Sequence, residues 1–306
     1  MGERSLLDRT FEAFKNDRIE NVVNDFFYGL GQIRRTLTAE AWKTFINDCR
    51  AHPVMGIFQQ DPFTRRCYQK PRGYPGDPVV MDLIYNEDPE LIASLKQESD
   101  LGLRIYREFL KHPETSAVRS RKAILTSKID ETLQRCPSPA IMSVGCGHLR
   151  EAEACQGMRD HQAVRFTAID QDTASLEVVR KTWNGRIGTA STSVVDILRK
   201  DTIRDTGFDL IYAAGLYDYL NDNLSERLTA ALFGKLRSGG KLLIANFIAE
   251  PPNVAFMEAC MDWWLIYRVE EDMIRMTARI DRKKLAELRL YTDDTGCIMF
   301  LELTSQ

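Results

Sequence analysis

The chain has 306 residues, and 41 lysines and arginines against 44 aspartates and glutamates give it a formal net charge of -3. This length suits one large domain with a smaller attachment, and the balance of charge argues against a nucleic-acid partner, because domains that bind nucleic acid are usually basic. Seven cysteines without a C-x-x-C pair predict free thiols in a cytoplasmic protein. The four histidines have no metal-ligand spacing and no apolar run is long enough to span a bilayer, so neither a metal nor a membrane partner is expected.

The first part of the chain has the periodicity of helices. Apolar residues three and four positions apart predict an amphipathic helix over residues 5–30. Further helices are expected over about 38–51, with Thr38 as the N-cap, and over about 79–85, 89–110 and 114–136. Because Pro137 and Pro139 prevent the last helix from continuing, the sequence predicts an all-helical region over 1–136 and a second domain over 137–306.

Residues 61–78 interrupt the helical pattern. Four prolines and two glycines predict an extended, turning backbone, which also carries Arg72, Tyr74 and Asp77. A rigid loop with cationic and aromatic side chains suits the binding of a ligand. On composition alone, a solvated surface connector is an equally simple interpretation.

In the second part, apolar runs alternate with helical stretches, a pattern typical of a doubly wound parallel sheet. The runs cover 140–144, 164–169, 193–198, 208–215 and 239–247. Gly145 and Gly147 after the first run allow a sharp turn and close approach of a ligand. Asp170 ends the second run, where a carboxylate can accept hydrogen bonds from ribose hydroxyls. The third glycine of the dinucleotide fingerprint is missing, which argues against a nicotinamide cofactor.

In this order, residues 140–305 resemble the class I S-adenosylmethionine-dependent methyltransferases. The resemblance implies a Rossmann-like, doubly wound sheet of seven strands that ends in an antiparallel hairpin, with strands near 288–291 and 297–303. It implies S-adenosylmethionine as cofactor and S-adenosylhomocysteine as product. In that family the loop after the first strand holds the cofactor's amino acid part, the acid after the second strand holds the ribose, and the acid after the third strand faces the adenine. The cofactor-binding positions are then Ser143, Gly145, Cys146, Gly147, Asp170, Gln171, Val195, Asp196, Ile197, Ala213 and Gly215.

Two further segments narrow the resemblance to a bacterial subgroup. They are Lys-Pro-Arg-Gly-Tyr-Pro-Gly-Asp at 70–77 and Gly-Leu-Tyr-Asp-Tyr-Leu at 215–220. Two activities in this subgroup match both segments. One is the methionine S-methyltransferase that begins dimethylsulfoniopropionate biosynthesis, and the other is a carboxylate O-methyltransferase that makes a hydroxy-fatty-acid methyl ester.

The residues favour methionine as the methyl acceptor. No histidine lies next to the fourth or fifth strand end, and neither a thioether nor an ionised carboxylate needs a base. Arg72 could bind the substrate carboxylate through two parallel N–H bonds, Asp218 could bind the ammonium, and Tyr74 could contact the sulfur. The other substrate-binding candidates are Tyr217, Tyr219, Asn246, Trp263 and Arg268.

Each candidate also has a structural interpretation. The tyrosines can belong to the core, the tryptophan can pack between helices, and Arg268 can pair with Glu271 or Asp272. A polar, charged loop at 70–77 suits a small zwitterion better than a long acyl chain. The sequence therefore predicts in-line methyl transfer to L-methionine without a general base, in a homodimer. A methyltransferase-like module that binds the cofactor without catalysis is the alternative from another class.

Overall fold

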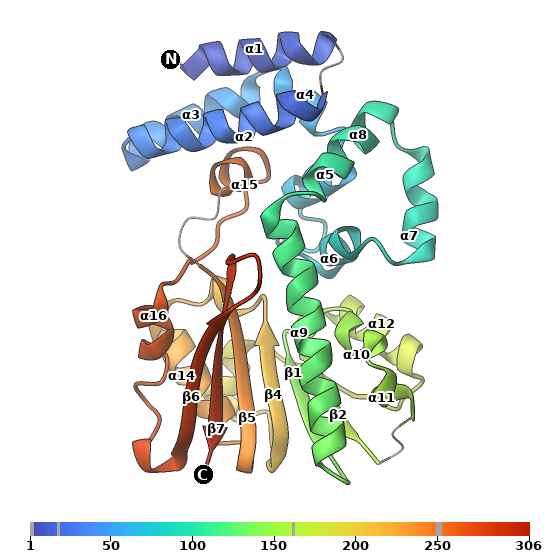
Figure 1. Ribbon diagram of the computed structural model, residues 1–306, viewed down its shortest axis with the longest axis vertical. Helices are drawn as coiled ribbons and strands as arrows, with labels where there is room; N and C mark the ends of the chain where they lie inside the picture. Colours follow the sequence, from blue (N-terminus) through green and yellow to red (C-terminus); the bar gives the residue numbers. More distant parts are fainter. Residues whose placement is uncertain (1–2, 17–18, 161–162, 249–252) are drawn as a thin grey trace. The chain divides into compact units, whose positions relative to one another are not determined.

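The computed structural model describes residues 3–16, 19–160, 163–248 and 253–306 (Figure 1). The chain forms two compact units, the first from 1–118 and 250–264 and the second from 119–249 and 265–306. The sequence predicts a domain boundary at 136/137, and the division between the two compact units falls inside the helix α9 (Pro113–Arg135). The proline pair follows the end of this helix. Residues 250–264, which the sequence assigned to the sheet domain, also belong to the first unit.

The first unit is helical. Phe256 lies at the centre of its aromatic core, with ring centroids 4.4 Å from Phe27, 5.2 Å from Phe58 and 5.1 Å from Phe109. The core thus joins residues that are far apart in the sequence. The helices are α1 (Glu3–Lys15), α2 (Ile19–Thr36), α3 (Ala39–Ala51), α4 (Val54–Phe58), α5 (Pro62–Gln69), α6 (Pro78–Tyr85), α7 (Pro89–Ser94), the 3-10 helix η1 (Leu95–Gln97), α8 (Asp100–Phe109) and α15 (Val254–Cys260).

Three details of the predicted helical region are wrong. The helix expected over 5–30 is two helices, and α2 continues to Thr36. The helix expected over 89–110 is divided into α7, η1 and α8, because Ser99 caps a new helix by accepting a hydrogen bond from Gly102 N. The loop expected over 61–78 contains α5, whose N-cap is Asp61 and whose first residue is Pro62. A proline at the first helical position starts a helix instead of breaking one.

A buried carboxylate holds α15 in the first unit. Glu258 Oε2 accepts hydrogen bonds from Arg34 Nε at 2.8 Å and from Trp42 Nε1 at 2.6 Å, and Oε1 accepts one from Arg34 Nη2 at 3.0 Å. Two parallel bonds to a guanidinium are among the strongest polar contacts in proteins. Helix α15, which carries Glu258, is thereby fixed to α2 and α3.

Glu258→Gln should lower the free energy of unfolding by about 2–4 kcal/mol, because Arg34 loses its counter-charge in a largely buried place. Urea denaturation followed by circular dichroism measures the change. Glu40→Gln is the matched control, because Glu40 is exposed on α3, and it should cost less than about 0.5 kcal/mol. Equal losses in both variants would show that the Glu258 contacts contribute nothing specific.

The second unit is built around one seven-stranded sheet of order β3-β2-β1-β4-β5-β7-β6. The first five strands are parallel, and β7 is antiparallel to both of its neighbours. This confirms the predicted class I methyltransferase fold, including the C-terminal hairpin. The strands are β1 (Ala140–Val144), β2 (Arg165–Asp170), β3 (Gly188–Ser191), β4 (Phe208–Ala214), β5 (Leu236–Phe247), β6 (Leu285–Thr292) and β7 (Ile298–Ser305).

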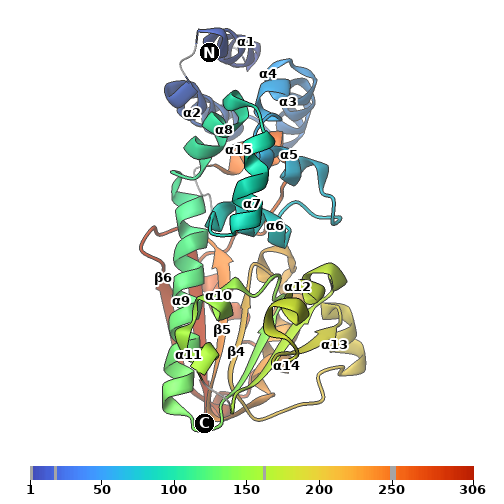
Figure 2. The ribbon, with the colours of Figure 1, turned by 90° about the vertical axis from the view of Figure 1, so that its right-hand side faces the viewer.

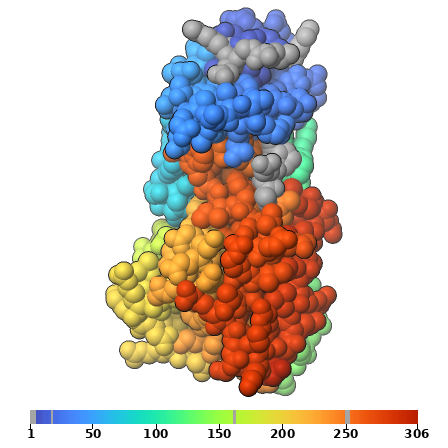
Figure 3. All heavy atoms as spheres, turned by 90° about the vertical axis from the view of Figure 1, so that its left-hand side faces the viewer, coloured from blue at the N-terminus to red at the C-terminus, as the bar shows by residue number. Residues whose placement is uncertain are grey.

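Helices cover both faces of this sheet. In Figure 2, α9 lies on one face, and α13 and α14 lie on the other. Orange and red atoms from the C-terminal part of the chain cover much of the second unit on the face drawn in Figure 3. None of the described helices is long and apolar enough to cross a bilayer. The helices of this unit besides α9 are α10 (Arg150–Ala154), α11 (Gln156–Asp160), α12 (Thr173–Trp183), α13 (Val194–Lys200), α14 (Asp222–Phe233), α16 (Glu270–Arg275) and the 3-10 helices η2 (Tyr217–Tyr219) and η3 (Arg282–Lys284).

The strand predicted over 193–198 is wrong. The third strand is β3, which begins five residues before the predicted segment and is partly exposed, and α13 occupies the predicted segment. Ser193 caps this helix, because its hydroxyl accepts a hydrogen bond from Asp196 N at 3.1 Å. Ser-x-x-Asp before apolar residues is a helix-start signal, and it prevails over the apolar run that suggested a strand.

Candidate functional site

The candidate site lies at the carboxyl ends of β1, β2 and β4 in the second unit. β1 pairs with β2 on one side and with β4 on the other, so the strand order reverses here, and in open α/β sheets ligands bind at such a point. β1 leads into Gly145, with φ +70°, and Gly147, with φ +53°. A Cβ on Gly145 would lie 3.3 Å from Leu216 Cβ, so both the conformation and the space favour glycine.

Hydrogen bonds fold this turn back onto the end of β2. Gly145 N and Cys146 N both donate to the carbonyl of Ile169, at 2.8 and 3.0 Å. Asp170 Oδ2 accepts a hydrogen bond from Gly147 N at 2.9 Å, and Oδ1 accepts one from Asp172 N at 2.9 Å. A carboxylate has about four acceptor positions, so each oxygen can also accept a hydroxyl. The turn and the acid predicted from the sequence thus form one unit of structure.

Burial shifts the pKa of two side chains in this turn. Asp170 is 7% exposed, and its desolvation raises the pKa of the carboxyl, against the lowering effect of the two backbone N–H groups. Burial likewise raises the pKa of the Cys146 thiol well above its usual range, so the thiol is neutral. Cys146 is therefore a small, unreactive residue in a tight turn.

Most of the predicted cofactor residues meet at this edge of the sheet. In the sheet, Ser143 of β1 pairs with Ala168 of β2 on one side and with Tyr212 of β4 on the other. The three strand ends therefore lie side by side. The conformation of Gly215, with φ +86°, again favours glycine. The predicted residues at these strand ends are Ser143, Gly145, Cys146, Gly147, Asp170, Gln171, Ala213 and Gly215.

The three residues predicted to face the adenine lie in the first turn of α13. Val195 is exposed and Ile197 belongs to the core of the second unit. Asp196 pairs with Lys200 Nζ at 2.8 Å and accepts a hydrogen bond from Ser193 Oγ, and these two contacts lower its pKa. The acid therefore lies on a helix and not at a strand end, and its role toward a cofactor stays a prediction.

A buried polar cluster next to the turn was not predicted. Tyr212 of β4 donates its hydroxyl to Glu151 Oε1 at 2.7 Å. Burial raises the pKa of Glu151, and the Tyr212 hydroxyl and the charge of Arg121 act against this rise. Arg121 lies on α9 and is 6% exposed.

The guanidinium of Arg121 lies against the backbone at the end of β4. A Cβ on Gly215 would be 3.4 Å from its Nη1, 3.6 Å from its Nη2 and 3.7 Å from its Cζ. Arg121 was not predicted from the sequence, because the whole helix was assigned to the N-terminal region. The sequence does indicate that Arg121 is buried, since it lies three positions after Val118 and four before Leu125, on the same face of the helix as these buried residues.

Asp218, the predicted ligand of a substrate ammonium, is buried in η2. Its Oδ1 accepts a hydrogen bond from Phe247 N at 2.8 Å, and its carbonyl accepts one from Ile266 N at 2.7 Å. Burial raises the pKa of the carboxyl, while the Phe247 N–H, Arg121 and Arg268 oppose the rise. The carboxyl is thus held by a backbone N–H at the end of β5.

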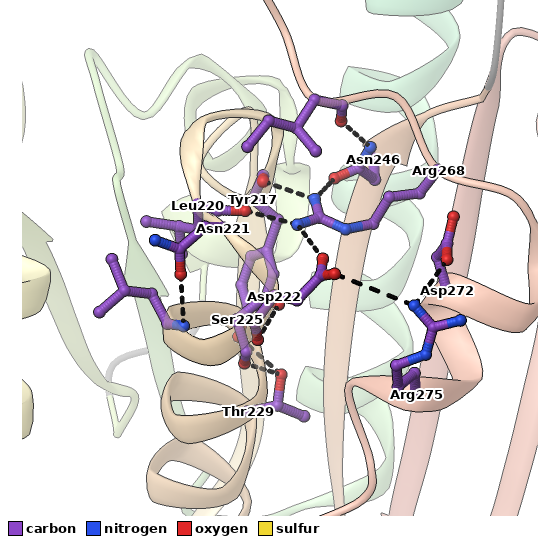
Figure 4. Close-up of polar contacts among 12 residues, drawn as sticks. Tyr217, Leu220, Asn221, Asp222, Ser225, Thr229, Asn246, Arg268, Asp272 and Arg275 are labelled. Carbon is purple, nitrogen blue, oxygen red and sulfur yellow. Dashed lines mark hydrogen bonds and ion pairs between the residues drawn. The ribbon is translucent and has the colours of Figure 1, made fainter.

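Three other predicted substrate residues form one interior network (Figure 4). Arg268 is 2% exposed; its Nη1 donates to Tyr217 O and Asn246 Oδ1, both at 2.7 Å, and its Nη2 donates to Leu220 O at 2.5 Å. Its ion pair is with Asp222, at 3.7 Å, and not with Glu271 or Asp272 as the sequence suggested. These contacts give Arg268 a structural role, and a contact with substrate stays a prediction.

The two tyrosine side chains of η2 differ in exposure. The Tyr217 ring is fully buried, and its hydroxyl lies 3.1 Å from Thr229 Oγ1. Tyr219 is 39% exposed, so η2 directs one predicted tyrosine into the core and the other to the surface. Of the two rings, only that of Tyr219 reaches the surface.

The other predicted substrate residues belong to the first unit. Segment 70–77 joins α5 to α6, and Asp77 fixes its end: it binds Arg66 through two parallel bonds of 3.0 and 2.8 Å and caps α6 at Val79 N and Val80 N. Lys70 forms an ion pair with Asp262 at the other end. Arg72 and Tyr74 lie between these fixed points and are partly buried, and Trp263 is buried. The described residues contain no group of three or more potential metal ligands.

Comparisons with known proteins support the fold. No protein-family profile matches the sequence, and no curated protein matches it. A protein from Bordetella parapertussis, described as a possible exported protein, is 17% identical with a TM-score of 0.54, over 79% of this chain and 94% of that one. At this identity the likeness shows a shared fold and not a shared activity.

Two similar solved structures of lower TM-score are methyltransferases. The N-methyltransferase NodS from Bradyrhizobium japonicum, in complex with S-adenosylhomocysteine, is 17% identical with a TM-score of 0.46, over 78% of this chain and 98% of that one. A TehB-like S-adenosylmethionine-dependent methyltransferase from Corynebacterium glutamicum is 14% identical with a TM-score of 0.44, over 75% of this chain and all of that one, at 100%.

Proposed function

We propose that this protein is an S-adenosylmethionine-dependent methyltransferase that acts on a small molecule. One observation carries the proposal: a glycine turn after β1 is closed by the buried carboxylate of Asp170 at the point where the strand order reverses. Such a site suits a ligand that combines a ribose with a compact charged group. The missing third glycine disfavours a dinucleotide.

The residues at this edge fit the proposed cofactor. Asp170 would accept the ribose hydroxyls, the turn at Gly145 and Gly147 would lie along the amino acid part, and the first turn of α13 would contact the adenine. The cofactor supplies a methyl group on a sulfonium, which is an electrophile without further activation. The protein then has to align the acceptor and exclude water, and a general base is needed only for an acceptor that must lose a proton.

L-methionine is our proposed acceptor, and S-methylmethionine is the proposed product. Thioether sulfur carries no proton, so methionine as acceptor needs no general base. A zwitterionic acceptor needs one cation and one anion, and we assign Arg72 and Asp218 to these roles, with Tyr74 as an apolar contact. A carboxylate O-methyltransferase for hydroxy fatty acids is the second candidate, because an ionised carboxylate also needs no base. The cytoplasmic homodimer stays a prediction.

Mass spectrometry tests the activity and the acceptor together. The purified protein is incubated with S-adenosylmethionine and either L-methionine or a 3-hydroxy fatty acid, and product is compared with a blank without protein. S-methylmethionine formed with an equal amount of S-adenosylhomocysteine supports the proposal. Product only from the hydroxy fatty acid favours the second candidate. Cofactor binding without methylation of either compound or of a cell metabolite extract favours a binding module.

Arg72→Lys should raise the KM for methionine about tenfold, because a charge-assisted pair of parallel bonds is replaced by a point charge. The affinity for S-adenosylhomocysteine should stay unchanged. Initial rates over a range of methionine concentrations give the first value, and calorimetry gives the second. Arg107→Lys on α8 is the control, since Arg107 is exposed. A KM equal to that of the unsubstituted protein would remove Arg72 from the substrate site.

A further inference from the structure

The buried guanidinium of Arg121 has no role in the function proposed so far. It lies on the part of α9 that belongs to the second unit, within van der Waals distance of the Cβ position at Gly215. A Cβ at residue 215 would already touch this cation, so the guanidinium packs closely against the backbone at residue 215. The structure thus brings a five-donor cation to the carboxyl end of β4, beside the glycine turn.

From this geometry we infer that Arg121 binds the α-carboxylate of the cofactor's amino acid part. The inference rests on the proposed function, which puts an amino acid along the turn at Gly145 and Gly147. A carboxylate there needs a cation, and a guanidinium pairs with it through two parallel N–H bonds. None of the residues predicted to bind the cofactor carries a positive charge.

The electrostatics around Arg121 agree with this role. Its charge favours the ionised forms of two buried acids, Glu151 and Asp218. Arg121 is also buried, and a buried side chain has little conformational entropy to lose when a ligand binds.

Three ligands separate this role from a structural one. S-adenosylhomocysteine has both the carboxylate and the amine, its decarboxylated analogue has only the amine, and 5′-methylthioadenosine has neither. By calorimetry, the protein should bind S-adenosylhomocysteine about 10- to 100-fold more tightly than the decarboxylated analogue, the range for one charged pair of hydrogen bonds. Equal affinities in the unsubstituted protein would overturn the inference without any variant.

The variants complete the thermodynamic cycle. Arg121→Gln should abolish the preference for the carboxylate while changing the affinity for 5′-methylthioadenosine less than about twofold. Arg121→Lys should retain part of the preference, because it keeps the charge and loses the fork. Arg135→Gln, at an exposed position of the same helix, is the control and should behave like the unsubstituted protein. Equal loss of affinity for all three ligands in Arg121→Gln would contradict the inference and indicate a structural role. If the unsubstituted protein binds none of the three ligands, the proposed function itself fails.

Discussion

Asp170→Ala should weaken the binding of S-adenosylhomocysteine by about 100-fold or more, since each hydrogen bond to a charged acceptor contributes about 1.5–3 kcal/mol and a ribose offers two donors. The substitution also removes the acceptor of Gly147 N and of Asp172 N, so the glycine turn loses one of the hydrogen bonds that hold it to β2. Both effects weaken cofactor binding, so the test does not require that the methyl acceptor is known. Calorimetry with S-adenosylhomocysteine measures the change directly.

The neighbouring carboxylate provides the control for this prediction. Asp172 caps α12 by accepting a hydrogen bond from Ala174 N, and asparagine caps helices about as well. Asp172→Asn should therefore leave the affinity within about twofold. If Asp170→Ala retains the affinity of the unsubstituted protein, Asp170 has no part in binding and the proposed site is wrong.

The pKa of Asp170 predicts a pH dependence with a definite sign. Ribose hydroxyls donate to the ionised carboxylate, and burial raises the pKa of this carboxyl above its ordinary value. The affinity should therefore be complete well above that raised pKa and fall as the pH decreases through it, beginning at a higher pH than for an exposed aspartate. In Asp170→Asn this part of the pH dependence should be absent.

The parts of the fold that the sequence predicted are those with a local signal. Strands β1 and β4 are buried on both faces, so they are continuous apolar runs in the sequence. The position of Asp170 follows from the end of such a run. Segment 193–198 shows the limit of the rule, because a serine three residues before an aspartate starts a helix even where valines and isoleucine follow.

What could not be predicted depends on contacts between distant residues. Glu258 belongs to the helical unit because Arg34, 224 positions away, binds its carboxylate. Arg121 reaches the end of β4 because α9 extends beyond the first unit. The sequence predicts that Arg268 binds substrate or pairs with a nearby acid, yet its main partners are backbone carbonyls. Every residue has a carbonyl, so such partners leave no trace in the sequence.

Arg268→Met should lower the free energy of unfolding of the second unit by about 3–5 kcal/mol, because three acceptors lose their donors in a buried place. The acceptors are Tyr217 O, Leu220 O and Asn246 Oδ1, and the two carbonyls come from opposite ends of η2 (Figure 4). Arg268→Lys should be nearly as damaging, since one nitrogen cannot reach acceptors that a planar fork spans. Urea denaturation measures both changes.

Arg275→Met on α16 is the matched control. Its side chain is 52% exposed and pairs with Asp272 at 3.0 Å and Asp222 at 3.9 Å, so its loss should cost less than about 1 kcal/mol. Asp218 lies between the two carbonyls that Arg268 holds, so Arg268→Met should also reduce turnover in protein that remains folded. A stable Arg268→Met variant whose only defect is a raised KM for the acceptor would reverse the interpretation, because the guanidinium would then bind substrate instead of supporting η2.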